Sequence, residues 1–176
     1  MTAARTAADL ERAWRALAAS SARSGAVALI TIRLGDGAHE CPARAALSPE
    51  LGVHGDRWSR GRRRDPGAQV TLMDSRVAEV LAAGGAPLHA AGDNFLVDLD
   101  LGEEALPPGT RLRLGGALVE VSLLPHTGCK KFRERLGAAA MDWVNERSSR
   151  SRRLRGVNCR VVEAGEVAVG DLVVPA

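Results

Sequence analysis

The stretch of this sequence with the most distinctive chemistry is VSLLPHTGCKKFRERLG, residues 121–137. Cys129 lies there three residues after His126 and directly before Lys130 and Lys131, which are the only two lysines of the chain. Cationic side chains and a helix N-terminus both stabilise a thiolate, the form of cysteine that binds soft metals or attacks sulfur. We predict that Cys129 is the most reactive cysteine, and the residues alone leave a small buried cysteine as an equally weighted alternative.

Histidines near this segment raise two further possibilities. A structural zinc site needs four ligands with paired spacing, and the remaining cysteines and histidines are scattered along the chain: His39, Cys41, His54, His89 and Cys159. Zinc is therefore a poor explanation. A Cys–His nucleophile pair, with His126 or His54 as the base, stays open because the sequence does not define its geometry.

Two other segments carry polar residues that suit ligand-binding loops. GVHGDRW, residues 52–58, has two glycines followed by Asp56 and Arg57, but it lacks the Gly-Lys-Ser/Thr ending of a P-loop. GDNFLVDLDL places Asp93 and Asn94 directly before a predicted strand. These two residues either form an Asx turn or direct the Asn94 amide at a ligand with donors and acceptors, such as a pterin ring.

The bulk composition excludes several classes of protein. The chain has 176 residues, of which 45% are apolar and 26% charged, as is usual for one globular domain. No stretch approaches the ~20 apolar residues of a membrane span, and no signal-peptide core is present, so no membrane partner is expected. Three cysteines without a CxxC pair argue against a disulfide framework and predict a cytoplasmic protein.

Arginine is concentrated in two runs, RWSRGRRR at residues 57–64 and RSSRSRRLR at residues 147–155. Such runs usually form a solvated face, and they can bind nucleic acid or a small anion. The chain has no recognised nucleic-acid motif and only three Trp, two Phe and no Tyr for base stacking. A small anionic ligand explains the arginines better, because a phosphate needs only one or two of them.

Hydrophobic periodicity predicts the elements that position these residues. A helix is expected over residues 7–21 and a second one with Asp74 as N-cap and Gly84 past its end, with more helical residues after Cys129. Strands are expected at residues 26–34, 68–73 and 95–101, the last with alternating buried and exposed positions. Further strands are expected after a hairpin turn at Asp36-Gly37, in a pair joined at Gly115-Gly116, and in the segment after Gly156.

This pattern gives about seven to nine short strands, few helices and no regular βαβ alternation. It predicts a mainly β fold, an antiparallel β-barrel that is closed or nearly closed, with a few peripheral helices. We expect a single domain, in which residues 1–24 form an N-terminal helix packed on a barrel of residues 25–176.

Several segments, in their order along the chain, resemble the MOSC domain, the module at the C-terminus of molybdenum cofactor sulfurases, and above all its small stand-alone bacterial members. The resemblance runs from about Gly25 to Val174 and rests on GVHGDRW, AQVTLMDSRV, GDNFLVDLDL, LPPGTRLRLGGALVEV, PHTGCKKFRERLG, DWVN and RLRGVNCRVVEAGEVAVGD. It implies a barrel of the kind inserted in pyruvate kinase and a molybdopterin-type molybdenum cofactor as the ligand.

The resemblance also implies roles for individual residues. Cys129 would be the molybdenum ligand or a persulfide carrier, with His126 as a second catalytic residue. The residues expected to bind the cofactor are Gly55, Asp56, Arg57, Asp93, Asn94, Thr127, Gly128, Lys130 and Lys131. Arg57 with a lysine would neutralise a phosphate, and Asn94 would bond the pterin. The three segments are expected to converge on one pocket.

Sulfurases and eukaryotic amidoxime reductases carry an additional MOSC-associated domain, and sulfurases a pyridoxal-phosphate desulfurase domain, and this sequence shows neither. Two functions remain: a molybdenum-dependent reductase of N-hydroxylated compounds, or a carrier that delivers sulfur or cofactor to other molybdoenzymes. The reductase would need a separate electron-donating reductase, because the chain lacks cysteines for an iron–sulfur cluster and a flavin fingerprint. The carrier would need a cysteine desulfurase. Nucleic-acid binding ranks below both.

Overall fold

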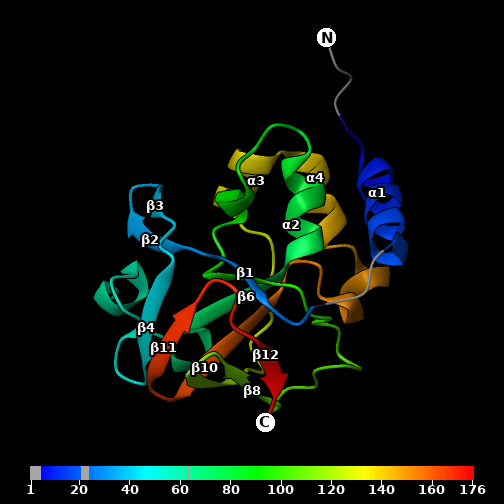
Figure 1. The fold of residues 1–176 in the computed structure, drawn as a ribbon. Helices are drawn as coiled ribbons and strands as arrows, with labels where there is room; N and C mark the ends of the chain where they lie inside the picture. Colours follow the sequence, from blue (N-terminus) through cyan, green and yellow to red (C-terminus); the bar gives the residue numbers. More distant parts are fainter. Residues whose placement is uncertain (1–4, 21–23, 63) are drawn as a thin grey trace.

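The computed structural model describes residues 5–20, 24–62 and 64–176, which form a β-barrel with α-helices gathered along one side (Figure 1). The strands are β1 Val27–Ile30, β2 Ile32–Gly35, β3 Ala38–Glu40, β4 Arg44–Ser48, β5 Gly52–Val53, β6 Val70–Asp74, β7 Phe95–Val97, β8 Arg111–Leu114, β9 Ala117–Val121, β10 Val157–Glu163, β11 Gly165–Ala168 and β12 Val173–Pro175. The helices are α1 Ala7–Ser20, α2 Ser75–Ala82, α3 Lys130–Leu136 and α4 Ala138–Val144, with short 3-10 helices η1 Arg57–Arg60, η2 Pro66–Ala68, η3 Leu88–Ala91 and η4 Arg147–Arg152.

The barrel wall is one seven-stranded sheet in the order β1-β7-β6-β10-β9-β8-β12, extended by a three-stranded sheet, β11-β4-β5. The two edge strands of the larger sheet meet, because Val27 N donates to Asp171 O at 2.8 Å and Val173 N donates to Gly25 O at 2.6 Å. The sheet therefore closes almost completely on itself, and the predicted mainly β barrel with few helices is confirmed.

One strand pair departs from the predicted antiparallel pattern. β6 and β7 run parallel, with Leu72 opposite Phe95, and α2 with η3 forms the connection between them. A parallel pair needs a long crossover, and a helix supplies it. The absence of βαβ alternation that the sequence predicted therefore holds for the rest of the described barrel but not here.

β7 is also shorter and more buried than its alternating sequence predicts. Phe95, Leu96 and Val97 are all buried, because β7 lies inside the sheet between β1 and β6 and the helices cover its outer face. Both faces of β7 therefore lie in apolar surroundings, and the alternating residues Asp98, Leu99 and Asp100 follow the strand, the first two half-buried and the last exposed.

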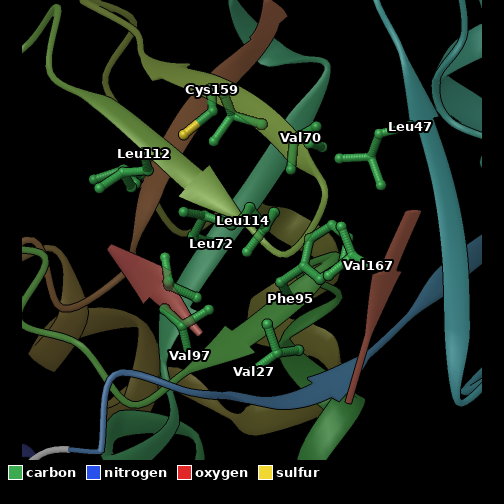
Figure 2. Close-up of a cluster of buried hydrophobic side chains, with 14 of the residues drawn as sticks. Val27, Leu47, Val70, Leu72, Phe95, Val97, Leu112, Leu114, Cys159 and Val167 are labelled. Atoms are coloured by element: carbon green, nitrogen blue, oxygen red, sulfur yellow. The ribbon is translucent and has the colours of Figure 1, made fainter. Parts of the chain in front are cut away.

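The interior of the barrel is filled by aliphatic side chains from both sheets (Figure 2). Leu47 and Val167 from the three-stranded sheet meet Leu72 and Phe95 from the seven-stranded one, so the two sheets enclose one core. Cys159 lies in this core with no exposed surface, and burial raises the pKa of its thiol to about 12. This cysteine is a packing residue.

A second apolar cluster lies between the barrel and the helices and includes Leu10 of α1 and Trp143 of α4. Glu11 fastens α1 there, because it accepts hydrogen bonds from Trp143 Nε1 at 2.9 Å and from Arg152 Nη1 at 2.9 Å. Burial would raise the pKa of Glu11, but these hydrogen bonds lower it to about 2. The expected end of α1 falls partly on residues 21–23, which lie outside the described residues.

Two local signals of the sequence are confirmed. Asp74 caps α2 by accepting a hydrogen bond from Arg76 N at 3.0 Å. Asp36 and Gly37 form the turn between β2 and β3 with φ of +46° and +86°. Within the described residues, no helix is both long enough and apolar enough to cross a membrane.

Candidate functional site

The three predicted segments lie in loops at the ends of regular elements. The first follows β5, and Asp56 is the N-cap of η1, where its Oδ1 accepts a hydrogen bond from Trp58 N at 2.9 Å. The second links η3 to β7 and contains Asp93 and Asn94. The third connects β9 to α3, of which Cys129 is the N-cap.

The first two segments meet in a buried hydrogen-bond network around Asp56. Arg33, in β2, donates from Nε to Asp56 Oδ2 and from Nη2 to Oδ1, both at 2.9 Å, which is a bidentate ion pair. Asn94 Nδ2 also donates to Asp56 Oδ2, at 3.0 Å, and Asn94 Oδ1 accepts from Arg33 Nη2 at 3.2 Å. Burial would raise the pKa of Asp56, but the hydrogen bonds and the charge of Arg33 lower it.

Asn94 and Asp56 are fully buried, and their polar groups are occupied inside the protein. The Asn94 amide completes its set of partners by accepting from Thr71 N at 3.1 Å and donating to Thr31 O at 3.2 Å. A buried amide with every partner in place loses hydrogen bonds by turning to a ligand. Asp56 and Asn94 thus both hold Arg33, and the direct cofactor contacts predicted for them stay a prediction.

The second and third segments meet through Asp93. Arg155 Nη1 donates to Asp93 Oδ2 at 2.5 Å, and Arg155 Nη2 donates to Ala91 O at 3.1 Å. His126 Nδ1 faces the other carboxylate oxygen, Asp93 Oδ1, at 3.5 Å. The guanidinium of Arg155 also lies over the ring of Phe132 in α3, 5.0 Å from its centroid. Asp93 therefore joins the histidine segment to the strand that follows Arg155.

Three atoms of this cluster are buried without a hydrogen-bond partner among the described residues: Asp93 Oδ1, His126 Nδ1 and Arg155 Nε. Burial and then the charge of Arg155 lower the pKa of His126 to about 4, although the charge of Asp93 acts in the opposite direction. His126 is therefore a neutral imidazole at neutral pH. It can accept or donate a hydrogen bond there, but it is a poor proton donor.

Cys129 is exposed, so the buried alternative does not apply to it. Lys130 and Lys131 follow it on the surface of α3, and Lys130 Nζ lies 3.8 Å from Glu134 Oε1. Gly128 before it is buried, and its N–H donates to Asn145 Oδ1 at 2.8 Å. A β-carbon at position 128 would come within 2.7 Å of the Met141 sulfur, so packing against α4 requires this glycine.

Arg57 is half-buried, and no hydrogen bond or ion pair of its side chain is found among the described residues. Arg57 lies close enough to His39 for its charge to act on that histidine. The pKa of His39 is lowered by burial first and then by the charges of Arg135, His89, Arg33 and Arg57. Gly55 adopts φ of +82°, so the turn before Asp56 explains this glycine.

A cavity of about 610 Å³ opens beside the third segment. Its walls come from the loop after β9, the end of α4, η4 and the start of β10, and they include Leu123, Leu124, His126, Thr127, Gly128, Val144, Glu146, Arg150, Arg153, Arg155 and Val157. This wall does not include Arg57, Asn94, Lys130 or Lys131. Cys129 is the next residue in the sequence after Gly128, which is the last residue of this loop in the wall. The three segments thus meet through buried contacts, and only the third lines the cavity.

Sequence reasoning missed Arg33 and Arg155, the two arginines that join the segments. The signal that could have indicated Arg33 is that it is the only charged residue in the apolar segment AVALITIRL. For Arg155 the signal is the glycine that follows it, directly before a predicted strand. Among the described residues, no group of three or more His, Cys, Asp or Glu side chains could hold a metal ion by itself.

Residues 53–174 match the family model described as "MOSC domain", which is more than half of the chain. The chain belongs to the MOSC domain family. This family is associated with molybdenum cofactor binding. The resemblance found in the sequence is thereby confirmed.

Solved structures share the fold of this MOSC domain. The YUAD protein from Bacillus subtilis is 18% identical with a TM-score of 0.60 over 86% of this chain and 96% of its own. YiiM from Escherichia coli is 18% identical with a TM-score of 0.57, covering 86% of this chain and 69% of its own. YiiM from Geobacillus stearothermophilus is 19% identical with a TM-score of 0.58, covering 85% and 75%. No curated protein sequence matches the chain.

Proposed function

We propose that this protein binds a molybdenum cofactor of the molybdopterin type through Cys129 and reduces N-hydroxylated compounds with it. The observation that carries the proposal is the placement of Cys129: this exposed cysteine is the next residue after Gly128 in the wall of a cavity, and His126 and Arg155 of the same wall each have a buried nitrogen without a hydrogen-bond partner among the described residues. A thiolate suits a soft metal, and a MOSC domain is associated with this cofactor.

The residues present fit such a group. The Cys129 thiol would be the protein ligand of the metal, and Arg57, whose side chain is uncommitted among the described residues, would neutralise a phosphate together with Lys130 or Lys131. Arg155 Nε, which has no hydrogen-bond partner among the described residues, offers a donor close to the same loop. When bound, the cofactor would supply two-electron redox chemistry.

The chain's own residues would then bind and orient. His126, neutral at neutral pH, would hydrogen-bond the substrate rather than protonate it. Reduction of an N–OH group to N–H with release of water consumes two electrons and two protons, which a separate electron-donating reductase and solvent would supply. The scarcity of cysteine fits function in the cytoplasm.

A carrier function is the second candidate, and the exposure of Cys129 favours it as well. A surface thiolate can take up a sulfur atom from a cysteine desulfurase as a persulfide and pass it to another molybdoenzyme. In that case the cavity beside it would receive part of a partner protein rather than a small molecule.

The test is metal analysis and pterin fluorescence of protein produced in a host that makes the cofactor, with Cys129→Ser compared with the matched exposed variant Cys41→Ser. We expect the wild-type protein and Cys41→Ser to retain molybdenum and to reduce an amidoxime with a chemical electron donor, and Cys129→Ser to retain the fold without the activity.

Arg57→Ala should release the cofactor more readily than Arg62→Ala, because a charge-assisted hydrogen bond contributes about 1.5–3 kcal/mol. Wild-type protein free of molybdenum but carrying a persulfide on Cys129 would overturn the reductase in favour of the carrier.

A further inference from the structure

The cavity beside the third segment has one polar ring atom that the protein leaves open. His126 lines the cavity, and its Nδ1 is buried toward Asp93, whereas its Nε2 has no partner among the described residues and is not one of the buried atoms. The imidazole therefore turns one nitrogen to the protein and the other to the cavity.

Asp93 and Arg155 decide which nitrogen carries the proton. Arg155 holds the Asp93 carboxylate through the contact at 2.5 Å, with side chains that are 6% and 0% exposed, so this ion pair fixes the orientation of the carboxylate. A carboxylate oxygen facing Nδ1 at 3.5 Å attracts an N–H and repels a lone pair. The proton of neutral His126 thus belongs on Nδ1, and Nε2 presents a lone pair to the cavity.

The arginines around the cavity do not make it a strong anion site. Arg155 is paired with Asp93, and Arg153 donates to Leu106 O at 2.5 Å and lies 3.9 Å from Glu103. Glu103 and Glu146 add negative charge to the same wall, and Arg150 is the remaining cation. The formal charges of the wall nearly cancel, so an uncharged ligand fits better than an anion.

Apolar side chains form a further part of the wall, beside the polar Ser122, Thr127 and Asn145. Leu123 and Leu124 are exposed beside the cavity, and Val144 and Val157 line it from α4 and β10. A cavity of this size can enclose a small aromatic or aliphatic molecule. Exposed leucines next to a polar acceptor form a site for a molecule with an apolar body and a donor at one end.

We propose that this cavity binds uncharged molecules whose apolar body ends in an O–H or N–H donor, that His126 Nε2 accepts the donor, and that Asp93 and Arg155 are positioning residues that set the histidine tautomer. As the substrate side of the same site, the inference rests on the proposed function. It can nevertheless be tested on protein without cofactor, so that its failure and that of the proposed function are separate results.

The first test is the tautomer itself. In metal-free protein with nitrogen-15 in its histidines, the spectrum at neutral pH should show His126 with its proton on Nδ1. Asp93→Asn should shift this tautomer toward a mixture, which loss of packing alone would not do in a folded protein. The spectrum of the wild-type protein is sufficient to overturn the proposal, because the proposal is wrong if neutral His126 carries its proton on Nε2.

The second test compares benzaldoxime with its O-methyl ether, which lacks the O–H group, the only hydrogen-bond donor of benzaldoxime. Calorimetry on metal-free protein should show that the parent binds at least about tenfold more tightly, because an acceptor left unpaired in a closed site opposes binding. His126→Phe should remove this preference, and the matched control His54→Phe, at an exposed histidine outside the cavity wall, should keep it. Equal binding of the two compounds, or a preference that survives His126→Phe, would overturn the proposal.

A third arm separates substrate from cofactor. Protein loaded with molybdenum should keep its metal in the His126→Phe variant, because the proposed metal ligand is Cys129. If His126→Phe loses molybdenum as completely as Cys129→Ser, the cavity holds the cofactor and the assignment of the cavity to substrate is wrong. Absence of molybdenum from every variant and from wild-type protein would instead overturn the proposed function and leave the binding measurements standing.

Discussion

At the scale of single residues, two buried arginine–carboxylate pairs organise this surface. Arg33–Asp56 and Arg155–Asp93 each place a charged pair almost out of contact with solvent. Removing one partner would leave the other charge buried and alone, which typically costs about 3–5 kcal/mol. Both pairs therefore keep their loops in one arrangement. Asp93 also faces His126 Nδ1 and so helps to fix the orientation of that ring.

The depressed pKa of His126 makes the free energy of unfolding depend on pH. Between pH 6.5, the usual histidine value, and pH 4 the unfolded chain binds a proton at His126 and the folded protein does not, so stability falls as the pH is lowered through this range. The loss from this residue is about 3 kcal/mol between pH 7 and pH 4. Denaturant titrations at half-unit pH steps measure it.

His126→Phe should reduce the slope of the curve between pH 6.5 and 4 more than His54→Phe does, and His39, whose pKa is also lowered, should keep part of the slope. Glu11 and Asp56 also have lowered pKa values, and their contributions to stability are lost mainly below pH 4.5, the ordinary value of a glutamate. If the free energy of unfolding of His126→Phe falls with pH as steeply as that of the wild-type protein, another group titrates in this range and the prediction is wrong.

The three thiols should react with iodoacetamide in a defined order. Cys129 is exposed beside two lysines, and we expect it to be labelled first at neutral pH, followed by Cys41, which is exposed with its sulfur 3.5 Å from His89 Nδ1. Cys159 should react only on unfolding, because burial raises its pKa to about 12 and closes access. Labelling rates against pH, with peptide mapping, test this order. Cys41 reacting before Cys129 would contradict the prediction.

At the scale of elements, close strand pairing controls which side chains are tolerated. Gly156 has φ of +94°, and a β-carbon there would lie 2.0 Å from Leu72 O in β6. Its neighbour Val157 pairs with Leu72 at the start of β10. The glycine thus lets the segment that carries Arg155 approach β6 closely enough to place the arginine beside Asp93.

Gly156→Ala should destabilise the fold by about 3 kcal/mol or more, because β6 and β10 must separate and the residue must also tolerate a positive φ. Gly170→Ala is a matched control, since Gly170 has φ of +93° with open space around it, and should cost only about 1–2 kcal/mol. Denaturant unfolding of both variants measures the difference. Equal losses would mean that the close approach has no energetic consequence.

At the scale of the whole molecule, the barrel and the helices engage many of the arginines that the sequence groups into runs. Arg60 donates to Leu34 O, and Arg64 lies over the Trp58 ring. In the second run, Arg152 binds Glu11 and lies over the Trp14 ring. Arginines held by internal partners contribute less to an extended cationic face.

We therefore expect weak DNA binding that disappears as salt is raised, because only a few phosphate contacts are available. Fluorescence anisotropy with two unrelated duplexes of equal length, titrated with potassium chloride, tests this. Equal affinities and a shallow salt slope are the expected result. Tight binding at physiological ionic strength that distinguishes the two sequences would contradict it.

The sequence by itself determined the elements and the barrel. Asp74 before α2, the Asp36-Gly37 turn and the strand at Arg111–Leu114 follow from caps, turn residues and periodicity, which act over a few residues. The segments that resemble the MOSC domain also lie within single stretches of chain. Such signals are local, and they can be read without knowing the fold.

Only the tertiary structure decided how the segments meet. The parallel pairing of β6 with β7, the ion pair between Arg33 and Asp56, and the contact of Asp93 with Arg155, 62 residues away, join residues with no relation along the chain. Such partners are selected by which buried charges and strand edges the packed barrel brings together. That long-range packing turns Asn94 inward, leaves Cys129 exposed and directs one nitrogen of His126 to the cavity.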